Sequence, residues 1–136
     1  MGAIAVRTQR LRVGTGVTCT IIRMHPAIVA QAAATAAALM PGRFFLGVGT
    51  GENLNEHVLG DRWPPAETRR AMLAEAVGVM RGLWQGELFS HHGEHFTVEG
   101  ARIYTLPPEP IEVMVAAGGA EAARLAGEIG DGLVAT

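Results

Sequence analysis

Apolar and polar residues follow one another along the chain in blocks that predict short strands separated by helices. Residues 43–49 form a short, continuous apolar run, which is typical of a parallel strand covered by helices on both faces. Residues 10–22 are rich in β-branched side chains and glycine, and they predict a strand that continues into a loop. Two further strands are expected at residues 111–117 and 133–136.

Helical periodicity fills the stretches between these strands. It is clearest over residues 66–85, where apolar side chains recur at helical spacing and charged ones lie elsewhere around the axis. Pro26 starts an alanine-rich helix over residues 27–40, because a first-turn proline gives up no helical hydrogen bond. The remaining predicted elements are the last turns of a helix at residues 2–9, a β-hairpin at residues 88–98 and a helix at residues 121–129.

The order of these elements predicts an α/β fold of the βαβ type, with about four parallel strands, their helices and an inserted β-hairpin. We interpret residues 1–136 as one incomplete domain, a partial (β/α)₈ TIM barrel. The pattern begins inside a helix and stops on a strand, and a closed barrel typically needs about 250 residues. We therefore expect a fragment that lacks strands at both ends. A small open-sheet domain is the alternative.

The composition and net charge of the chain limit the kinds of molecule that it is expected to bind. Hydrophobic residues make up 49% of the chain and charged residues 18%, which disfavours disorder. The net charge of −2 gives no electrostatic reason to expect nucleic acid or an anionic membrane. The longest apolar stretch is too short to span a bilayer, and no signal peptide is recognisable. The single cysteine excludes an internal disulfide, which suits the reducing cytoplasm. Together, these features lead us to expect a soluble, cytoplasmic protein with a small-molecule substrate.

The carboxyl ends of parallel strands are where α/β folds place their chemistry. Glu52 follows the strand at residues 43–49 directly, and a carboxyl group there, partly shielded from water, could act as a general acid or base. The alternative is a carboxylate at the N-cap or in the first turn of a helix that starts nearby. Asn55 could hydrogen-bond the amide edge of a ring, or it could be an ordinary loop residue.

Gly118 and Gly119 precede a predicted helix, so free backbone N–H groups there could hold a phosphate, although such turns also occur without any ligand. Neither a P-loop nor the G-x-G-x-x-G pattern of dinucleotide-binding folds is present. The hairpin carries His91, His92 and His95, but neighbouring strand residues point apart, so we expect solvated histidines and no metal site.

Two motifs carry a resemblance to a known family. Residues 14–31 (GTGVTCTIIRMHPAIVAQ) and residues 42–56 (GRFFLGVGTGENLNE) closely resemble the luciferase-like oxidoreductases of the branch that contains F420-dependent glucose-6-phosphate dehydrogenases. Residues 113–119 and 126–133 are similar to later strands and helix of the same group. The resemblance covers essentially the whole chain, and the block GVGTGENLNE is its most specific part. It implies the barrel fold and the deazaflavin coenzyme F420, with FMN as the alternative cofactor.

The resemblance also implies roles for individual residues. Glu52 matches the glutamate that exchanges a proton beside the reacting ring, and Asn55 matches a coenzyme-binding asparagine. Cys19 occupies a ring-contacting position, and the Gly16–Val17 bond matches a cis peptide behind the ring. Gly118, Gly119, Glu121 and Ala122 match the stretch that holds the phosphate of the coenzyme tail, and Thr136 matches a threonine at the sugar-phosphate site.

The chain departs from the family in what it lacks. The family's aspartate and catalytic histidine come from a strand before Met1, and its substrate-phosphate lysines and arginine come after Thr136. The expected activity is hydride transfer between a carbinol, such as a sugar phosphate, and F420, in a full-length homodimer. The alternatives are an FMN-dependent luciferase-like monooxygenase and a non-catalytic module that assembles through its open sheet edges.

Overall fold

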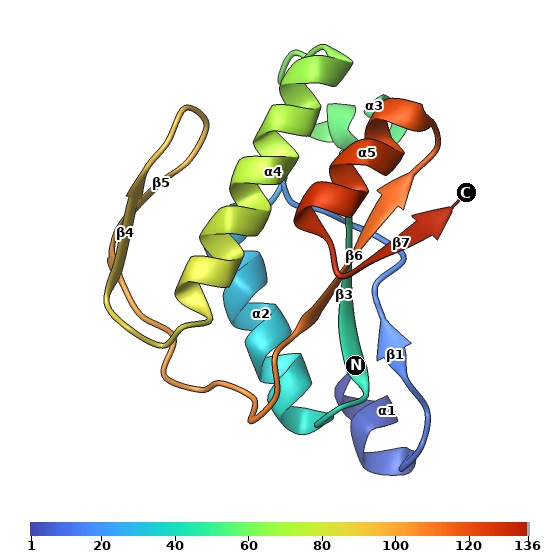
Figure 1. The fold of residues 1–136 in the computed structure, drawn as a ribbon, viewed down its shortest axis with the longest axis vertical. Coiled ribbons are helices and arrows are strands. Elements are labelled where there is room, and N and C mark those ends of the chain that lie inside the picture. The colour runs from blue at the N-terminus through green and yellow to red at the C-terminus, as the bar shows by residue number, and fades with distance from the viewer. Residues whose placement is uncertain (136) are drawn as a thin grey trace.

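A curled, fully parallel sheet forms the centre of the molecule in a computed structural model that describes residues 1–135 (Figure 1). Its strand order is β1-β3-β6-β7, with β2 paired to β3 beyond the end of β1. The strands are β1 (Val13–Gly14), β2 (Thr18–Cys19), β3 (Phe44–Gly49), β6 (Glu112–Ala117) and β7 (Gly132–Ala135). The sheet confirms the predicted part of a (β/α)₈ barrel, with β1 and β7 as its edges.

Residues 10–22, predicted as a strand that continues into a loop, contain two short strands on the same edge of β3. The backbone pairing with β3 is interrupted between them, and the peptide bond of Gly16-Val17 is cis, as the resemblance implies. The hydroxyl of Thr15 donates a hydrogen bond to the carbonyl of Gly47 at 2.7 Å. A Cβ atom at Gly47 would lie 1.9 Å from the carbonyl oxygen of Thr15, so only glycine lets the two segments come this close.

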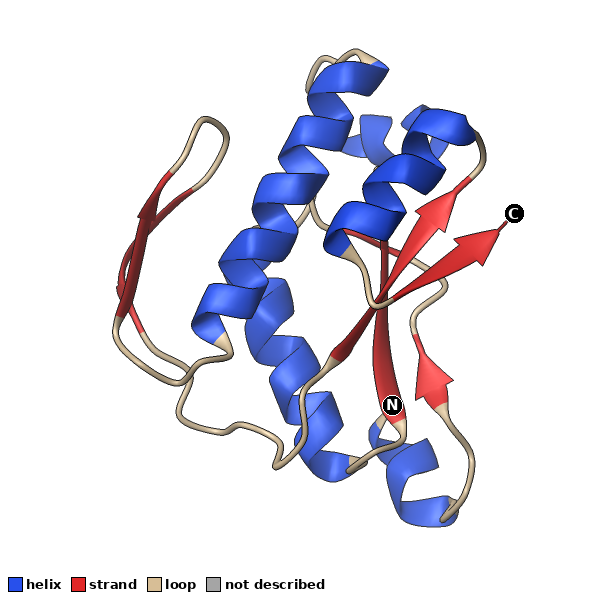
Figure 2. Cartoon of the chain, viewed as in Figure 1, coloured by secondary structure: helices blue, strands red, loops and turns tan. Residues whose placement is uncertain are grey.

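Three helices cover one side of the sheet (Figure 2). They are α2 (Pro26–Leu39), α4 (Ala66–Leu83) and α5 (Ala120–Ile129), each within two residues of its predicted bounds. Ala30 and Ala34 of α2 are fully buried, and the indole N–H of Trp84 donates to the Ala30 carbonyl at 3.0 Å. Small side chains on α2 therefore allow α4 to pack closely. Helix α2 packs on β3 and α5 packs on β6, and α4 packs against both of these helices.

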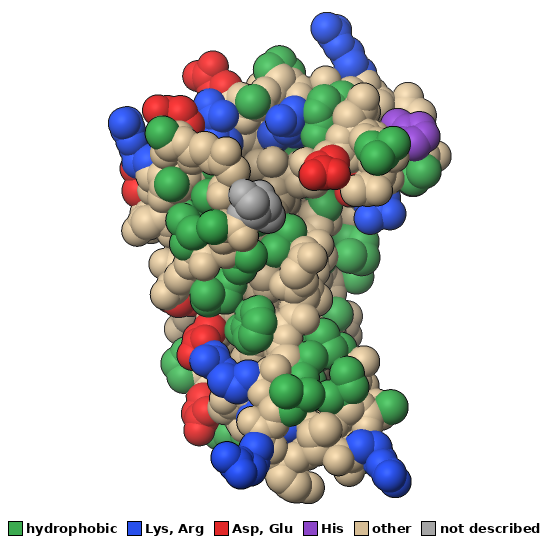
Figure 3. All heavy atoms as spheres, turned by 90° about the vertical axis from the view of Figure 1, so that its right-hand side faces the viewer, with side chains coloured by type: hydrophobic (Ala, Val, Ile, Leu, Met, Phe, Trp, Pro, Cys, Tyr) green, Lys and Arg blue, Asp and Glu red, His purple; other side chains and the backbone are tan. Residues whose placement is uncertain are grey.

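The opposite side of the sheet carries only short segments. Figure 3 faces the side on which β1 and β7 lie, and it shows apolar side chains along the middle with charged groups toward both ends. Leu11, Val17 and Leu133 are among the exposed large apolar residues, and all three lie on or beside edge strands. α1 (Gly2–Arg7) lies near the start of β1.

The hairpin stands apart from the sheet, against α4 (Figure 1). It consists of β4 (Phe89–His92) and β5 (Thr97–Ala101), paired antiparallel as predicted, with β5 extending three residues further. After β3 the chain forms a short helix, α3 (Asn53–Glu56), followed by a 3₁₀ turn (His57–Leu59). Within residues 1–135, no helix combines the length and the apolar character needed to cross a membrane.

Candidate functional site

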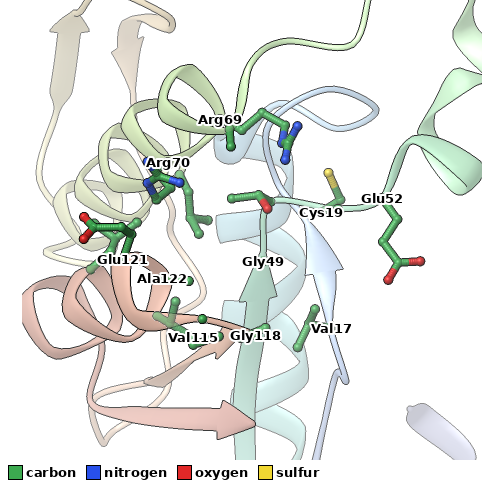
Figure 4. A pocket seen from close by; sticks show the side chains of 18 of the residues that line it. Val17, Cys19, Gly49, Glu52, Arg69, Arg70, Val115, Gly118, Glu121 and Ala122 are labelled. Atoms are coloured by element: carbon green, nitrogen blue, oxygen red, sulfur yellow. The ribbon is translucent and has the colours of Figure 1, made fainter. Parts of the chain in front are cut away.

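A cleft of about 970 Å³ opens at the carboxyl ends of β2, β3 and β6 (Figure 4). This is the edge at which parallel α/β sheets hold their ligands. Every candidate residue that the structure describes contributes to its walls: Gly16, Val17, Cys19, Glu52, Asn55, Gly118, Gly119, Glu121 and Ala122. Thr136, the candidate for the sugar-phosphate site, lies outside the described residues. Residues distant in the sequence thus meet around one space.

Glu52 and Asn55 are held by a short helical turn at the end of β3. Glu52 is the N-cap residue of α3, and its carbonyl accepts hydrogen bonds from the N–H groups of Asn55 at 2.9 Å and Glu56 at 3.0 Å. The N-cap position agrees with the helix alternative, but the side chain makes no capping hydrogen bond, so the carboxylate itself is not occupied by the helix. Both side chains are exposed, and the expected shielding of the Glu52 carboxyl group is therefore not provided by residues 1–135.

An ion pair that the sequence did not predict anchors this turn. Glu56 is only 3% exposed, and its Oε2 lies 2.7 Å from Nε of Arg23, whose side chain is half-exposed. Both residues line the cleft. A buried carboxylate is costly unless a charge compensates for it, so Arg23 stabilises the buried position of Glu56. The pair links the loop after β2 to the turn that carries Glu52 and Asn55.

Cys19 packs against this anchor. Burial raises the pKa of the Cys19 thiol, and the neighbouring Glu56 carboxylate adds to the rise. A protonated thiol is a poor nucleophile, so this buried side chain is suited to packing and not to nucleophilic attack. Gly51 has a φ of +69°, and a Cβ atom there would lie 2.7 Å from Sγ of Cys19 and 3.0 Å from Cγ of Glu56. Glycine at this position lets the loop close over the thiol.

The other wall of the cleft is the start of α5. Gly118 and Gly119 lead into this helix, and the first helical hydrogen bond joins the Ala123 N–H to the Gly119 carbonyl at 2.9 Å. The N–H groups that precede Ala123 in the helix have no partner within it, which suits an anionic group. A Cβ atom at Gly16 or Gly119 would meet no atom within 4 Å, so both glycines border open space.

Two arginines of α4 complete the cleft and were not predicted as site residues. Arg69 stacks on Trp63, with its guanidinium carbon 4.5 Å from the ring centroid, and donates to the Pro64 carbonyl at 2.9 Å. Arg70 also lines the cleft, but residues 1–135 offer it no ion-pair partner. The sequence did contain a signal, because Arg70 lies off the apolar stripe of α4. That signal could not be distinguished from an ordinary solvated helix face.

The histidines of the hairpin lie away from the cleft, around a second carboxylate. Glu75 of α4 accepts hydrogen bonds from Nε2 of His91 at 3.0 Å and from the backbone N–H groups of Phe96 at 2.8 Å and His95 at 3.0 Å. Burial raises the pKa of Glu75, but these hydrogen bonds outweigh burial and hold the pKa below its usual value. Among residues 1–135, no three potential metal ligands come together.

A parallel βαβ sheet with a ligand-sized cleft at its carboxyl edge defines part of a (β/α) barrel of the ligand-binding kind. The family model described as luciferase-like monooxygenase matches residues 1–136. The chain belongs to this luciferase-like family.

Relatives with curated names agree with the family. The chain is 46% identical over 136 residues to an F420-dependent glucose-6-phosphate dehydrogenase of Nakamurella multipartita. It is 49% identical over 137 residues to the protein of the same name in Segniliparus rotundus. In both cases the whole chain is matched, whereas it spans only about two fifths of the relative, 40% and 41% respectively.

Solved structures of F420-dependent enzymes share the fold of this chain. An F420-dependent secondary alcohol dehydrogenase in complex with an F420-acetone adduct superposes with a TM-score of 0.94 at 40% identity. The match covers 99% of this chain and 41% of that one. The F420-dependent tetrahydromethanopterin reductase of Methanopyrus kandleri superposes with a TM-score of 0.88 at 22% identity, which shows the shared fold.

Proposed function

We propose that residues 1–136 supply the coenzyme-binding wall of an F420-dependent oxidoreductase, completed by further strands of the barrel. The observation that carries this proposal is the single cleft into which β2, β3 and β6 bring the candidate coenzyme residues. The names of relatives at 46% and 49% identity, and a structure at 40% identity with an F420 adduct, support the same coenzyme. On this proposal the chain by itself holds only part of the active site.

The residues present fit such a coenzyme. A cleft of about 970 Å³ is large enough for a tricyclic ring and a phosphate-bearing tail. Glycines with open space above them border it, and the free N–H groups of the α5 start suit a phosphate. We assign Gly16, Val17, Cys19 and Asn55 to the ring, and we assign Gly118, Gly119, Glu121 and Ala122 to the tail.

When bound, F420 supplies a deazaflavin ring that exchanges a hydride with a substrate carbon. Glu52 is the proton partner in this proposal. Its carboxylate extends from the turn after β3 with no hydrogen bond that would occupy it within residues 1–135, so it is free to hold or release a proton beside the reacting atoms. The Arg23–Glu56 pair keeps the backbone of this turn in place.

A carbinol is the substrate class that we propose, because loss of a hydride and a proton converts it to a carbonyl. The relatives' names make a sugar phosphate the first compound to test, and Thr136 its proposed contact. We also propose a cytoplasmic homodimer as the working form. The FMN-dependent monooxygenase alternative has less support. A monooxygenase from Streptomyces bottropensis, an EDTA monooxygenase and a type II Baeyer-Villiger monooxygenase superpose at 24%, 22% and 21% identity, which shows the fold alone.

Replacement of Glu52 tests the proposal in the complete protein. We expect Glu52→Gln to lower the rate of F420 reduction by a secondary alcohol or sugar phosphate about 10²- to 10⁴-fold, the usual contribution of a general acid or base. Because the amide keeps the shape of the side chain, F420 affinity should change little. Glu112→Gln, which removes an exposed carboxylate from the far end of β6, is the control and should keep the wild-type rate. An unchanged rate in Glu52→Gln would refute the assignment.

A further inference from the structure

Arg70 is the one cleft-lining arginine whose side chain has no ion pair or hydrogen bond to the described residues. Three arginines enter the cleft: Arg23, Arg69 and Arg70. Arg23 compensates the buried Glu56, and Arg69 is fixed on Trp63 and the Pro64 carbonyl. Arg70 is only partly exposed, yet neither a carboxylate nor a carbonyl among residues 1–135 pairs with its guanidinium.

Arg70 lies on the same side of the cleft as the start of α5. Helices α4 and α5 pack together, and Arg70, Glu121 and Ala122 line the same cleft. In Figure 4 the side chain of Arg70 lies on the side of Glu121 and Ala122, whereas Glu52 lies at the far side of the space. Arg70 therefore adds a full positive charge to the wall where the backbone of α5 presents its free N–H groups.

The contacts of the neighbouring Arg69 order the backbone that carries the Arg70 guanidinium, which favours recognition of an anion. Arg69, one residue earlier, holds the first turns of α4 against the 63–64 segment through its stacking contact and its hydrogen bond. The backbone from which Arg70 extends is thereby ordered. A guanidinium with several N–H donors and no partner of its own binds phosphate or carboxylate oxygens in a bidentate way.

The geometry points to Arg70 as a specificity residue for the anionic tail of the bound cofactor, acting across from the Gly118 and Gly119 backbone. The inference rests on the proposed function, because it assigns the tail end of that same cleft. Glu121 is the competing partner for Arg70, since its carboxylate stands on the same wall. It lies 3.9 Å from Arg124 at an exposed position, so it neutralises Arg70 only weakly.

The experiment compares two probes that share the ring and differ in the tail. Binding of F420 and of its phosphate-free deazaflavin riboside is measured by fluorescence titration with the complete wild-type protein and the Arg70→Gln variant. We expect Arg70→Gln to weaken F420 binding about ten- to hundred-fold, the range for loss of one charged hydrogen-bonding partner. Riboside binding should stay unchanged. Arg70→Lys should restore part of the affinity.

Arg124→Gln is the matched control, because it removes an exposed arginine of α5 that does not line the cleft. Equal loss of both probes in Arg70→Gln would mean that Arg70 only shapes the cleft, and loss of neither would mean that it does not contact the tail; both results overturn the inference. If the wild type binds neither probe, the proposed function fails separately. Inorganic phosphate then decides: thermal stabilisation of the wild type beyond that of Arg70→Gln supports the anion site, and equal stabilisation overturns it.

Discussion

Two carboxylates, Glu56 at the cleft and Glu75 beside the hairpin, each accept a positively charged or N–H partner from another segment, but they lie in different regions of the molecule. Glu56 is 3% exposed and lies 2.7 Å from Arg23. The Glu75 side chain is 14% exposed and accepts hydrogen bonds from His91 and from two backbone N–H groups of the hairpin turn. Each links a turn to a neighbouring segment that lies far away in the sequence.

The difference lies in what each turn carries. The turn that Glu56 anchors carries Glu52 and Asn55 into the cleft. The hairpin that Glu75 anchors carries histidines that lie outside the cleft. The partners differ too, because arginine keeps its charge at all ordinary pH values and histidine does not. We infer that the first carboxylate positions a site and that the second stabilises a hairpin.

The largest effect should come from glycines with positive φ in the two regions. We predict that Gly51→Ala lowers the free energy of unfolding by about 2–4 kcal/mol, because the new methyl group meets Cys19 and Glu56 in an unfavourable backbone conformation. Gly100→Ala in the hairpin, with a φ of +54° and nothing within 4 Å, should cost only about 1 kcal/mol. Urea unfolding of both variants measures the two values. Equal losses would show that the loop over Cys19 is not tightly packed.

The carboxylates themselves give the next effect. Glu56→Gln and Glu75→Gln should each destabilise the protein by about 1–3 kcal/mol. The first removes the charge that pairs with Arg23, and the second replaces a charged acceptor of the hairpin hydrogen bonds by a neutral one. Only Glu56→Gln should also weaken F420 binding, because it frees the turn that carries Asn55. Titration of both variants at a temperature where both remain folded separates the two roles. If Glu75→Gln weakened binding as much, the division into a site anchor and a hairpin anchor would be wrong.

The pH dependence of stability should show the smallest effect. A carboxyl group whose pKa is lowered by folding stabilises the native state above its unfolded value, and this contribution is lost as the pH falls through the folded value. For Glu75 the loss should therefore begin near its ordinary pKa of 4.5 and continue below it. Unfolding curves between neutral pH and the acid range should converge for the wild type and Glu75→Gln. Curves that stay parallel would contradict the role of its hydrogen bonds.

Much of this arrangement could be predicted from the sequence, and the exceptions have a common physical cause. Strand β3, helices α2, α4 and α5 and the hairpin follow from periodicity, because local patterns determine them. The break between β1 and β2 does not, since it depends on the fit of Thr15 against Gly47. The Arg23–Glu56 pair was also missed, because the two residues are distant in the sequence and neither has a special spacing.

The candidate site shows the same division. The positions of Glu52, Asn55 and Gly118 followed from the rule that strand ends carry function, together with the family resemblance. The exposure of Glu52 could not be predicted, because it depends on which segments cover the cleft. Arg70 could not be singled out before α4 and α5 were placed side by side.

All of these roles depend on the binding of a deazaflavin coenzyme in this cleft. Its most direct test is equilibrium titration of the complete protein with F420 and with FMN, followed by ring fluorescence. We predict saturable F420 binding that is at least about tenfold tighter than FMN binding, a difference of about 1.4 kcal/mol. We also predict that this binding is weakened by Glu56→Gln. Tighter binding of FMN, or no saturable binding of F420, would contradict the proposed coenzyme.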